Sequence, residues 1–401
     1  MEKNLNSFFN AKSVAVIGAS NSPGKVGNII MKKLDKLKGR VIPINKKGEK
    51  IEGKDSYKKI ADYPKKIELA IIATPSKTVP KIIEQCIKKE IKNIIIISAG
   101  FSEVGNYKLE KKILNLKLKH NLNILGPNCF GMINPKKNLD LTFAKETVKK
   151  GNTVFISQSG ALGSYILDYK IPLRAFISVG NMIDLNFADW IEYFNEDKKT
   201  KKIVCYIESL HDGKRFIEAC KNSKKEIIVI KAGKTEKGKN ATMSHTASLA
   251  TDYKIYQGAF KQAKVKQSKS LIRAFGIREE NIVYKLKGKK VAIITNAGGA
   301  GALLTDQLES QGYEIYGPKD ILGTATSKDY KSALNKIKAN YDSIIVVLTP
   351  QTMSEPEKTA CILSESKFKH KIVACFLGKS SIEEAKKILQ ENGISYITKA
   401  V

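Results

Sequence analysis

The residues whose types and spacing suggest chemistry lie in three glycine-rich turns, each placed between an apolar run and a helical pattern. The turns read GASNSPGKVG (Gly18–Gly27), SQSGALG (Ser157–Gly163) and TNAGGAG (Thr295–Gly301). Small residues there let backbone N–H groups approach an anion at the positive end of a helix dipole. One such turn can also be tight geometry without a ligand. Three of them together favour a protein that handles phosphate.

The residues after the second predicted strand, Val41–Asn45, bear on which ligand the first turn accepts. A dinucleotide-binding fold places an Asp or Glu there to hold the ribose. This chain has Asn45-Lys46-Lys47 instead. The pattern argues against NAD and favours a phosphate group.

The most informative segment for catalysis runs from Lys231 through Gly238 to Ser244-His245-Thr246-Ala247-Ser248-Leu249-Ala250. It is small and polar with no amphipathic period, so it predicts a loop. An imidazole flanked by hydroxyl groups could act there as a nucleophile toward phosphorus. Such an imidazole needs a carboxylate to orient it, and Glu208, at the end of the strand Ile203–Ile207, is the candidate. The other three histidines, His120, His211 and His370, are expected to be structural.

Strands and helices alternate along the whole chain, which is typical of parallel sheets covered on both faces. The predicted strands are Ser13–Ala19, Val41–Asn45, Leu69–Thr74, Ile94–Ser98, Asn123–Leu125, Val154–Ser157, Ala175–Val179, Ile203–Ile207, Ile227–Lys231, Val291–Thr295, Ser343–Leu348 and Lys371–Phe376. The rhythm restarts twice, so the fold class is α/β with three doubly wound domains. The expected limits are 1–147, 148–265 and 288–401, with a linker over 266–287.

Composition sets the broad class of protein. The chain has 401 residues with 70 Lys and Arg against 39 Asp and Glu, a formal charge of +31. Nucleic-acid binding is one interpretation, but the only arginines are Arg40, Arg174, Arg215, Arg273 and Arg278, and lysine is spread evenly. A general Lys, Ile and Asn bias explains the charge better. The six cysteines lack metal-ligand spacing, no secretory signal or membrane span is found, and a cytoplasmic location without a metal site is expected.

With these residues in hand, the chain resembles the α subunit of the ADP-forming acyl-CoA synthetases (acetate–CoA ligases), within the succinyl-CoA synthetase superfamily. The resemblance covers essentially the whole chain in order. Its landmarks are the three turns together with SAGFSE (Ser98–Glu103), GPNCFGMINP (Gly126–Pro135), SVGN (Ser178–Asn181), YIES (Tyr206–Ser209), KAGKTEKG (Lys231–Gly238) and SHTASLA (Ser244–Ala250). So many motifs at consistent spacing are more specific than any one glycine-rich loop.

The resemblance implies a Rossmann-like CoA-binding domain followed by two flavodoxin-like ligase domains. The implied reaction converts acyl-CoA, phosphate and ADP into acid, CoA and ATP, reversibly, through an acyl phosphate and a phosphohistidine at His245. Glu208 matches the carboxylate that orients this histidine. The phosphate would be held at two helix starts, by Ser159, Gly160, Ala161, Gly299 and Ala300.

The same resemblance assigns the CoA site to the first domain, with Lys25 near a phosphate. The residues expected to bind CoA are Gly18, Ser20, Pro23, Gly24, Lys25, Val26, Gly27, Asn45, Lys47, Thr74, Pro75, Ser98 and Asn128. The chain departs from the usual family pattern at Lys46 and Ala300, where proline is common, at Met182, where lysine is common, and at Ala247, where glycine is common. None of these changes removes a reacting group.

No segment resembles the ATP-grasp domain that binds nucleotide and magnesium in this superfamily. The expectation is therefore a β subunit that carries this domain, with ADP or ATP and Mg²⁺ bound there, in an α2β2 heterotetramer. Two other classes stay open: a catalytically silent CoA-binding regulatory protein of the same fold, and the CoA-binding half of a protein acetyltransferase. Neither nucleic acid nor a membrane is an expected partner.

Overall fold

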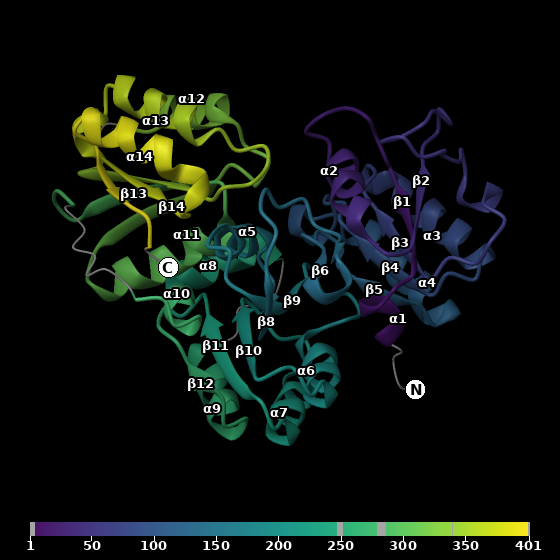
Figure 1. The fold of residues 1–401 in the computed structure, drawn as a ribbon. Helices are drawn as coiled ribbons and strands as arrows, with labels where there is room; N and C mark the ends of the chain where they lie inside the picture. Colours follow the sequence, from purple (N-terminus) through teal and green to yellow (C-terminus); the bar gives the residue numbers. More distant parts are fainter. Residues whose placement is uncertain (1–4, 247–251, 279–285, 339, 400–401) are drawn as a thin grey trace.

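The computed structural model describes residues 5–246, 252–278, 286–338 and 340–399. Three separate sheets dominate it, each with helices packed on its faces (Figure 1). The α/β class with three doubly wound units is confirmed.

The first sheet is entirely parallel, in the order β2-β1-β3-β4-β5. Its strands are β1 (Ser13–Ile17), β2 (Arg40–Ile44), β3 (Leu69–Ile72), β4 (Asn93–Ile96) and β5 (Asn123–Leu125). The helices of this part are α1 (Asn6–Phe9), α2 (Val26–Lys33), α3 (Val79–Lys88) and α4 (Tyr107–His120). The central strands β1, β3 and β4 are buried at every residue, as expected for strands covered on both faces.

The second sheet runs β12-β11-β10-β8-β9-β6-β7. Its strands are β6 (Met132–Asn134), β7 (Leu139–Asp140), β8 (Lys150–Ser157), β9 (Leu173–Ser178), β10 (Lys202–Ile207), β11 (Glu226–Lys231) and β12 (Lys266–Gln267). Its helices are α5 (Gly160–Asp168), α6 (Phe187–Glu196), α7 (Gly213–Asn222), α8 (Glu236–Thr246), α9 (Tyr253–Gln262) and α10 (Leu271–Ala274).

The third sheet is again parallel, in the order β14-β13-β15-β16-β17. Its strands are β13 (Lys290–Thr295), β14 (Glu314–Asp320), β15 (Ser343–Leu348), β16 (Ile372–Phe376) and β17 (Ser395–Ile397). Its helices are α11 (Gly298–Ser310), α12 (Ser327–Asn335), α13 (Pro356–Glu365) and α14 (Glu383–Glu391), with a 3-10 turn at Ser380–Ile382 before α14.

Strand pairing assigns two short segments differently from the sequence. Residues 132–140 fall in the predicted first domain, yet β6 pairs antiparallel with β9 of the second sheet. Residues 266–267 fall in the predicted linker, yet they pair with β11. Both are two- or three-residue strands without a periodic pattern, so only their spatial partners identify them. The domain limits themselves stay a prediction.

All three parallel cores share one topology. When each core's five parallel strands are counted in chain order, the arrangement is 2-1-3-4-5, the flavodoxin-like order. In this order, ligands bind outside the carboxyl ends of the strands, at the switch point between the neighbouring strands 1 and 3. That rule points to three places: after β1 and β3, after β8 and β10, and after β13 and β15.

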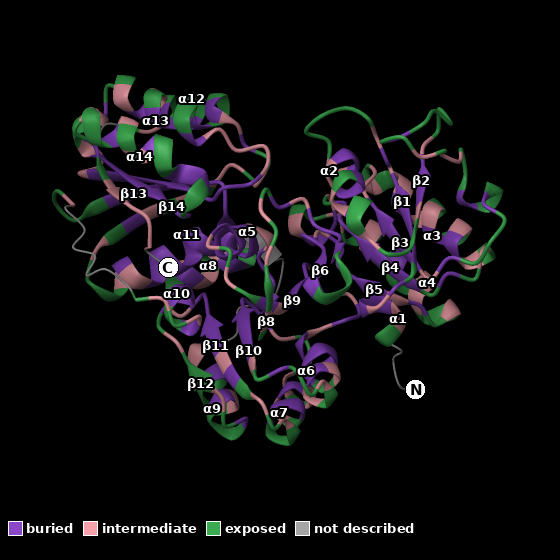
Figure 2. Ribbon diagram, viewed as in Figure 1, coloured by how far each residue is buried: buried purple, intermediate pink, exposed green. Residues whose placement is uncertain are grey.

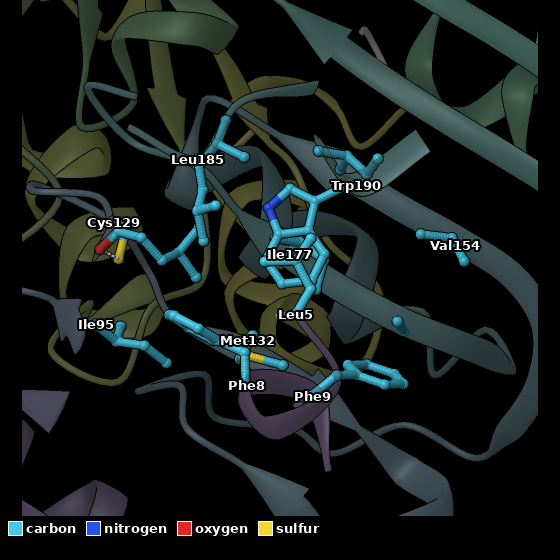
Figure 3. Close-up of a cluster of buried hydrophobic side chains, with 14 of the residues drawn as sticks. Leu5, Phe8, Phe9, Ile95, Cys129, Met132, Val154, Ile177, Leu185 and Trp190 are labelled. Atoms are coloured by element: carbon cyan, nitrogen blue, oxygen red, sulfur yellow. Dashed lines mark hydrogen bonds between the residues drawn. The ribbon is translucent and has the colours of Figure 1, made fainter. Parts of the chain in front are cut away.

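Buried residues follow the strands of all three sheets (Figure 2), and their side chains form clusters that span neighbouring sheets. One cluster links the first and second sheets, where Phe8 meets Trp190 edge to face with ring centroids 6.1 Å apart (Figure 3). A second cluster links the second and third sheets and includes Tyr165, Val204 and Val291. The helix starts of the second and third units are therefore held at fixed positions relative to one another.

Candidate active site and CoA-binding loops

Two helix starts and one strand end meet at Gly299, in the first turn of α11. A Cβ atom at this position would lie 2.7 Å from the Tyr206 hydroxyl, 3.0 Å from Glu208 Oε1 and 3.0 Å from Ser159 Cβ. Ser159 is the N-cap of α5, and its Oγ accepts a hydrogen bond from the Leu162 amide at 3.3 Å. The structure thus brings together the predicted residues Ser159, Glu208 and Gly299, which come from three different segments.

Both helices present their N-terminal ends at this place. Gly160 follows the cap of α5 directly, and a Cβ there would lie 2.8 Å from Phe130 Cβ. At α11 the N-cap is Ala297, whose side chain cannot accept a hydrogen bond. The first amides of a helix have no partner within the helix and carry partial positive charge. Paired helix starts are therefore suited to an anion such as phosphate.

Glu208 is buried and held at the end of β10 by its neighbours. Its backbone amide donates to Gln158 Oε1 at 2.6 Å, and the Ser209 amide donates to the same oxygen at 2.9 Å. The Tyr206 hydroxyl lies 3.1 Å from Glu208 Oε1 and 3.2 Å from the Gly299 carbonyl oxygen. Burial, together with the nearby Glu208 charge, raises the pKa of Tyr206 well above its usual value. Tyr206 therefore keeps its proton and is a hydrogen-bond donor at neutral pH.

A buried lysine lies on the neighbouring strand. Lys231 ends β11, and its ammonium sits 4.3 Å from the centroid of the Tyr256 ring. Burial lowers the pKa of Lys231 to about 8, although the charges of Asp306 and Glu208 act in the opposite direction. A cation with a pKa of about 8 thus lies at the end of the strand that pairs with β10, close enough to feel the charge of Glu208.

The prediction of a loop around His245 is wrong in part, because α8 runs from Glu236 to Thr246 and includes this residue. The helix starts where the Thr235 hydroxyl accepts the Gly238 amide at 3.2 Å, an N-cap that a search for amphipathic periodicity does not detect. The side chain of His245 and residues 247–251 lie outside the described part of the structure. The pairing of His245 with Glu208 therefore stays a prediction.

In the first unit, the predicted CoA-binding turn is built on close backbone contacts. Gly18 has φ +96°, and a Cβ there would lie 2.4 Å from the Ala73 carbonyl oxygen, at the carboxyl ends of the neighbouring strands β1 and β3. A Cβ at Gly27 would lie 2.0 Å from the Gly18 carbonyl oxygen. Only glycine allows these approaches, which fold the turn against the start of α2. Pro23, Gly24 and Lys25 are exposed at its tip, between Ser20 and Val26.

The other predicted CoA residues lie at the same edge of the first sheet. Asn45 Nδ2 donates to the Ala19 carbonyl at 2.6 Å, and the Lys47 amide donates to Asn45 Oδ1 at 2.8 Å. Ser98 Oγ donates to the Thr74 carbonyl at 2.5 Å, next to Pro75.

The Asn128 amide in turn donates to the Ser98 carbonyl at 3.0 Å. The turn after each of the five strands is thus connected to a neighbouring turn.

Sequence reasoning missed two residues that shape the candidate active site. Gln158 follows β8 directly and anchors Glu208, and Tyr206 contacts both Glu208 and Gly299. Gln158 could have been found from its place at the switch point of the second sheet. Tyr206 could not have been found in this way, because its contact with Gly299 of α11 depends on how the second and third units pack.

Within the described residues, no group of three or more His, Cys, Asp or Glu side chains is placed to hold a metal ion. Across the same part of the chain, every helix is too short or too polar to cross a membrane.

Two known protein families match separate parts of this chain. Residues 12–135 match a CoA binding domain, and residues 150–278 match a succinyl-CoA ligase like flavodoxin domain. The chain is 37% identical to the acetate–CoA ligase (ADP-forming) II subunit alpha of Pyrococcus furiosus, covering 97% of this chain and 93% of that one. It is 40% identical to an acetate–CoA ligase (ADP-forming) of Methanocaldococcus jannaschii, covering 96% of this chain but 60% of that longer one.

Among solved structures, the fold matches an acetyl-coenzyme A synthetase 1 from Ca. Korarchaeum cryptofilum in complex with phosphate and ADP. The TM-score is 0.66 and the sequence identity 31%, over 99% of this chain and 94% of that one. The chain belongs to the ADP-forming acetate–CoA ligase family.

Proposed function

We propose that this chain is the α subunit of an ADP-forming acid–CoA ligase that interconverts acyl-CoA, phosphate and ADP with acid, CoA and ATP. Within the chain, the observation that carries this proposal is the meeting of Ser159, Glu208 and Gly299 from three segments. The two helix starts would bind the phosphoryl group as an anion during its transfer, and the carboxylate would orient the histidine that accepts it.

The first step joins phosphate to the acyl carbon. A phosphate oxygen attacks the thioester carbonyl, the C–O bond forms, the C–S bond breaks, and CoA leaves as the thiolate, which takes up a proton. The phosphate would be held by Ser159, Gly160, Ala161, Gly299 and Ala300. The CoA would occupy the turns of the first sheet, where Lys25 stands at the N-cap of α2, close to where a phosphate of CoA would lie.

The second step moves the phosphoryl group to the enzyme. A ring nitrogen of His245 attacks phosphorus, the N–P bond forms, and the bond from phosphorus to the acyl oxygen breaks to release the carboxylate. Glu208 would accept a hydrogen bond from the N–H of the other ring nitrogen, which keeps its proton, and would stabilise the positive charge that develops on the ring. Its anchor at Gln158 fixes the direction from which it does so.

The third step returns the phosphoryl group to a nucleotide. An oxygen of the ADP β-phosphate attacks phosphorus, and the N–P bond to His245 breaks to give ATP. We place ADP and Mg²⁺ on a partner β subunit with an ATP-grasp domain, in an α2β2 assembly. Two facts support a partner: the Pyrococcus furiosus relative is named a subunit alpha, and the Methanocaldococcus jannaschii relative continues well beyond the length of this chain.

The test is the intact mass of the purified chain after incubation with acetyl-CoA, phosphate and magnesium, alone and with the co-expressed partner. The expected result is an acid-labile gain of one phosphate in the wild type and none in His245→Ala. His245→Ala should still bind CoA, because the CoA site lies in the first unit. A wild type that binds CoA but gains no phosphate under either condition would instead identify a catalytically silent CoA-binding protein.

A further inference from the structure

A carboxylate of the third unit holds the base of the helix that carries His245. Asp306 lies in α11, and its Oδ2 accepts the Gly233 amide at 2.8 Å. Its Oδ1 accepts the Lys234 and Thr235 amides, both at 2.8 Å, and the Thr235 hydroxyl at 3.0 Å. These donors immediately precede α8, so one side chain fixes the entry to that helix from a different sheet.

The helix α8 is shaped to receive this carboxylate. A Cβ at Gly238 would lie 1.9 Å from Asp306 Oδ1, so any larger residue would displace the carboxylate. A second contact from α11 acts on the same turn, where the Lys237 amide donates to Glu309 at 3.2 Å. All of these contacts involve residues 233–238, at the end of α8 far from His245.

The second unit contains an equivalent contact, made by a carboxylate of α5 with a loop of the third unit. Asp168 ends α5, and its Oδ2 accepts the Lys379 amide at 2.6 Å, while its Oδ1 accepts the Ser380 and Ser381 hydroxyls at 3.0 and 2.6 Å. Asp168 stands nine positions after the α5 cap Ser159, and Asp306 stands nine positions after the α11 cap Ala297.

The two loops held in this way are also equivalent. Gly233-Lys234-Thr235 follows β11, and Gly378-Lys379-Ser380 follows β16, and each of these strands is the fourth of its parallel core. Both helices that start at the candidate phosphate site therefore also bind a turn of the other unit through an Asp side chain. Helix α11 binds the Gly-Lys-Thr turn of the second unit, and α5 binds the Gly-Lys-Ser turn of the third. The two turns differ in the helix that each one enters, because the first leads into α8 and His245 and the second into α14.

We propose that Asp306 is a positioning residue for phosphoryl transfer, which fixes the base of α8 so that its far end presents His245 to the candidate phosphate site. The inference rests on the proposed function. Eleven residues make α8 about 16 Å long, so a tilt of about 10° at its base moves its far end by about 3 Å. A displacement of about 1 Å in a reacting group can already cost about 100-fold in rate.

The equivalent carboxylate supplies a matched control for the experiment. Asp306→Ala and Asp168→Ala each remove one buried carboxylate from the same interface, but only the first releases the histidine helix. The full-length chain, co-expressed with its partner, is incubated with acetyl-CoA, magnesium and radiolabelled phosphate. The readouts are the single-turnover rate of His245 labelling, the KM for acetyl-CoA, and the melting temperature.

We expect both variants to melt at lower temperature by a similar amount. Asp306→Ala should be labelled at least about tenfold more slowly with KM within about twofold of wild type, and Asp168→Ala should stay within about threefold of the wild-type rate. Equal slowing in the two variants, or wild-type labelling of Asp306→Ala, would overturn the inference. If either alanine variant does not fold, Asp306→Asn and Asp168→Asn replace the pair. The labelling rate of Asp306→Asn is then expected to be at least about threefold lower than that of Asp168→Asn.

The labelling of the wild type and of His245→Ala tests the proposed function separately from the role of Asp306. A labelled wild type and an unlabelled His245→Ala support the proposed function whatever the Asp306 result. An unlabelled wild type overturns the proposed function and this inference together.

Discussion

Gln158 and Glu208 are fifty positions apart in the chain, and the side-chain oxygen of the first accepts the backbone amide of the second at 2.6 Å. The contact joins the ends of β8 and β10, the two neighbouring strands at the switch point of the second sheet. The third sheet repeats it, since Asn296 Oδ1 accepts the Thr349 amide at 2.8 Å at the ends of β13 and β15. An amide side chain thus fixes the ligand-binding edge of both sheets.

Replacing Gln158 by Ala should slow phosphoryl transfer, because the Glu208 and Ser209 amides lose their shared acceptor and the carboxylate loses its fixed position. We expect a fall in the labelling rate of about tenfold or more, with the KM for acetyl-CoA unchanged. The control is Ser209→Ala, which removes only the 3.1 Å bond from Gln158 Nε2 to the Ser209 hydroxyl. Equal rates in the two variants would show that the anchor of Glu208 does not matter.

Gly299→Ala tests the crowding between the two helix starts. The added methyl group would lie 2.7 Å from the Tyr206 hydroxyl, closer than carbon and oxygen approach without a shift of one of them. The rate of His245 labelling should fall strongly. The double variant Gly299→Ala/Tyr206→Phe should recover part of this rate, because it lacks the hydroxyl oxygen nearest to the added methyl group.

Gly258→Ala is the control for Gly299→Ala, because a Cβ there has no neighbour within 4 Å. That change should leave activity intact and stabilise α9 by up to about 1 kcal/mol. Failure of Tyr206→Phe to restore any activity would argue that the glycine serves another purpose.

The fold was largely predictable from the sequence, and the reason lies in local patterns. Runs such as Val291–Thr295 are apolar and β-branched, and each ends at a small-residue turn, so strands, turns and their order follow from the chain itself. Ser159, Gly299 and Glu208 could be selected because a doubly wound sheet collects such positions at one edge. The structure brings these three residues together, while their role in binding and catalysis stays a prediction.

What could not be predicted depends on partners distant in sequence. Asp306 looks like an ordinary polar residue of a helix until the fold brings it to Gly233. The same carboxylate accepts the Lys234 and Thr235 amides and so fixes the start of α8, which the local sequence pattern predicts as a loop. Met132–Asn134 shows no alternation of apolar and polar residues, and it forms a strand because it pairs with β9. Nonlocal hydrogen bonds of this kind leave no trace in composition or periodicity.

Lys25→Met tests the predicted CoA loop. Lys25 is exposed at the N-cap of α2, so its loss should leave the fold unchanged and weaken the attraction for a phosphate group of CoA. The KM for acetyl-CoA should rise about fivefold to tenfold while the maximal rate stays near wild type. Lys32→Met, on the same helix, is the matched control for the loss of one charge. With acetyl phosphate and ADP as substrates, which need no CoA, both variants should match wild type.

Lys231→Met tests the buried ammonium through the pH dependence of stability. The pKa of Lys231 is about 8 in the folded chain against 10.5 for an unperturbed lysine, so the unfolded chain binds the proton more tightly between these values. Burial of the charge therefore costs stability in full below about pH 8, and the cost disappears as the pH rises toward 10.5. Relative to Lys231→Met, the wild type should gain up to about 3 kcal/mol in unfolding free energy across that window. Denaturant unfolding of both chains from pH 7 to pH 10.5 measures the difference, in which the titration of all other groups cancels. Parallel curves would mean that Lys231 keeps an ordinary pKa, held by the charges of Glu208 and Asp306.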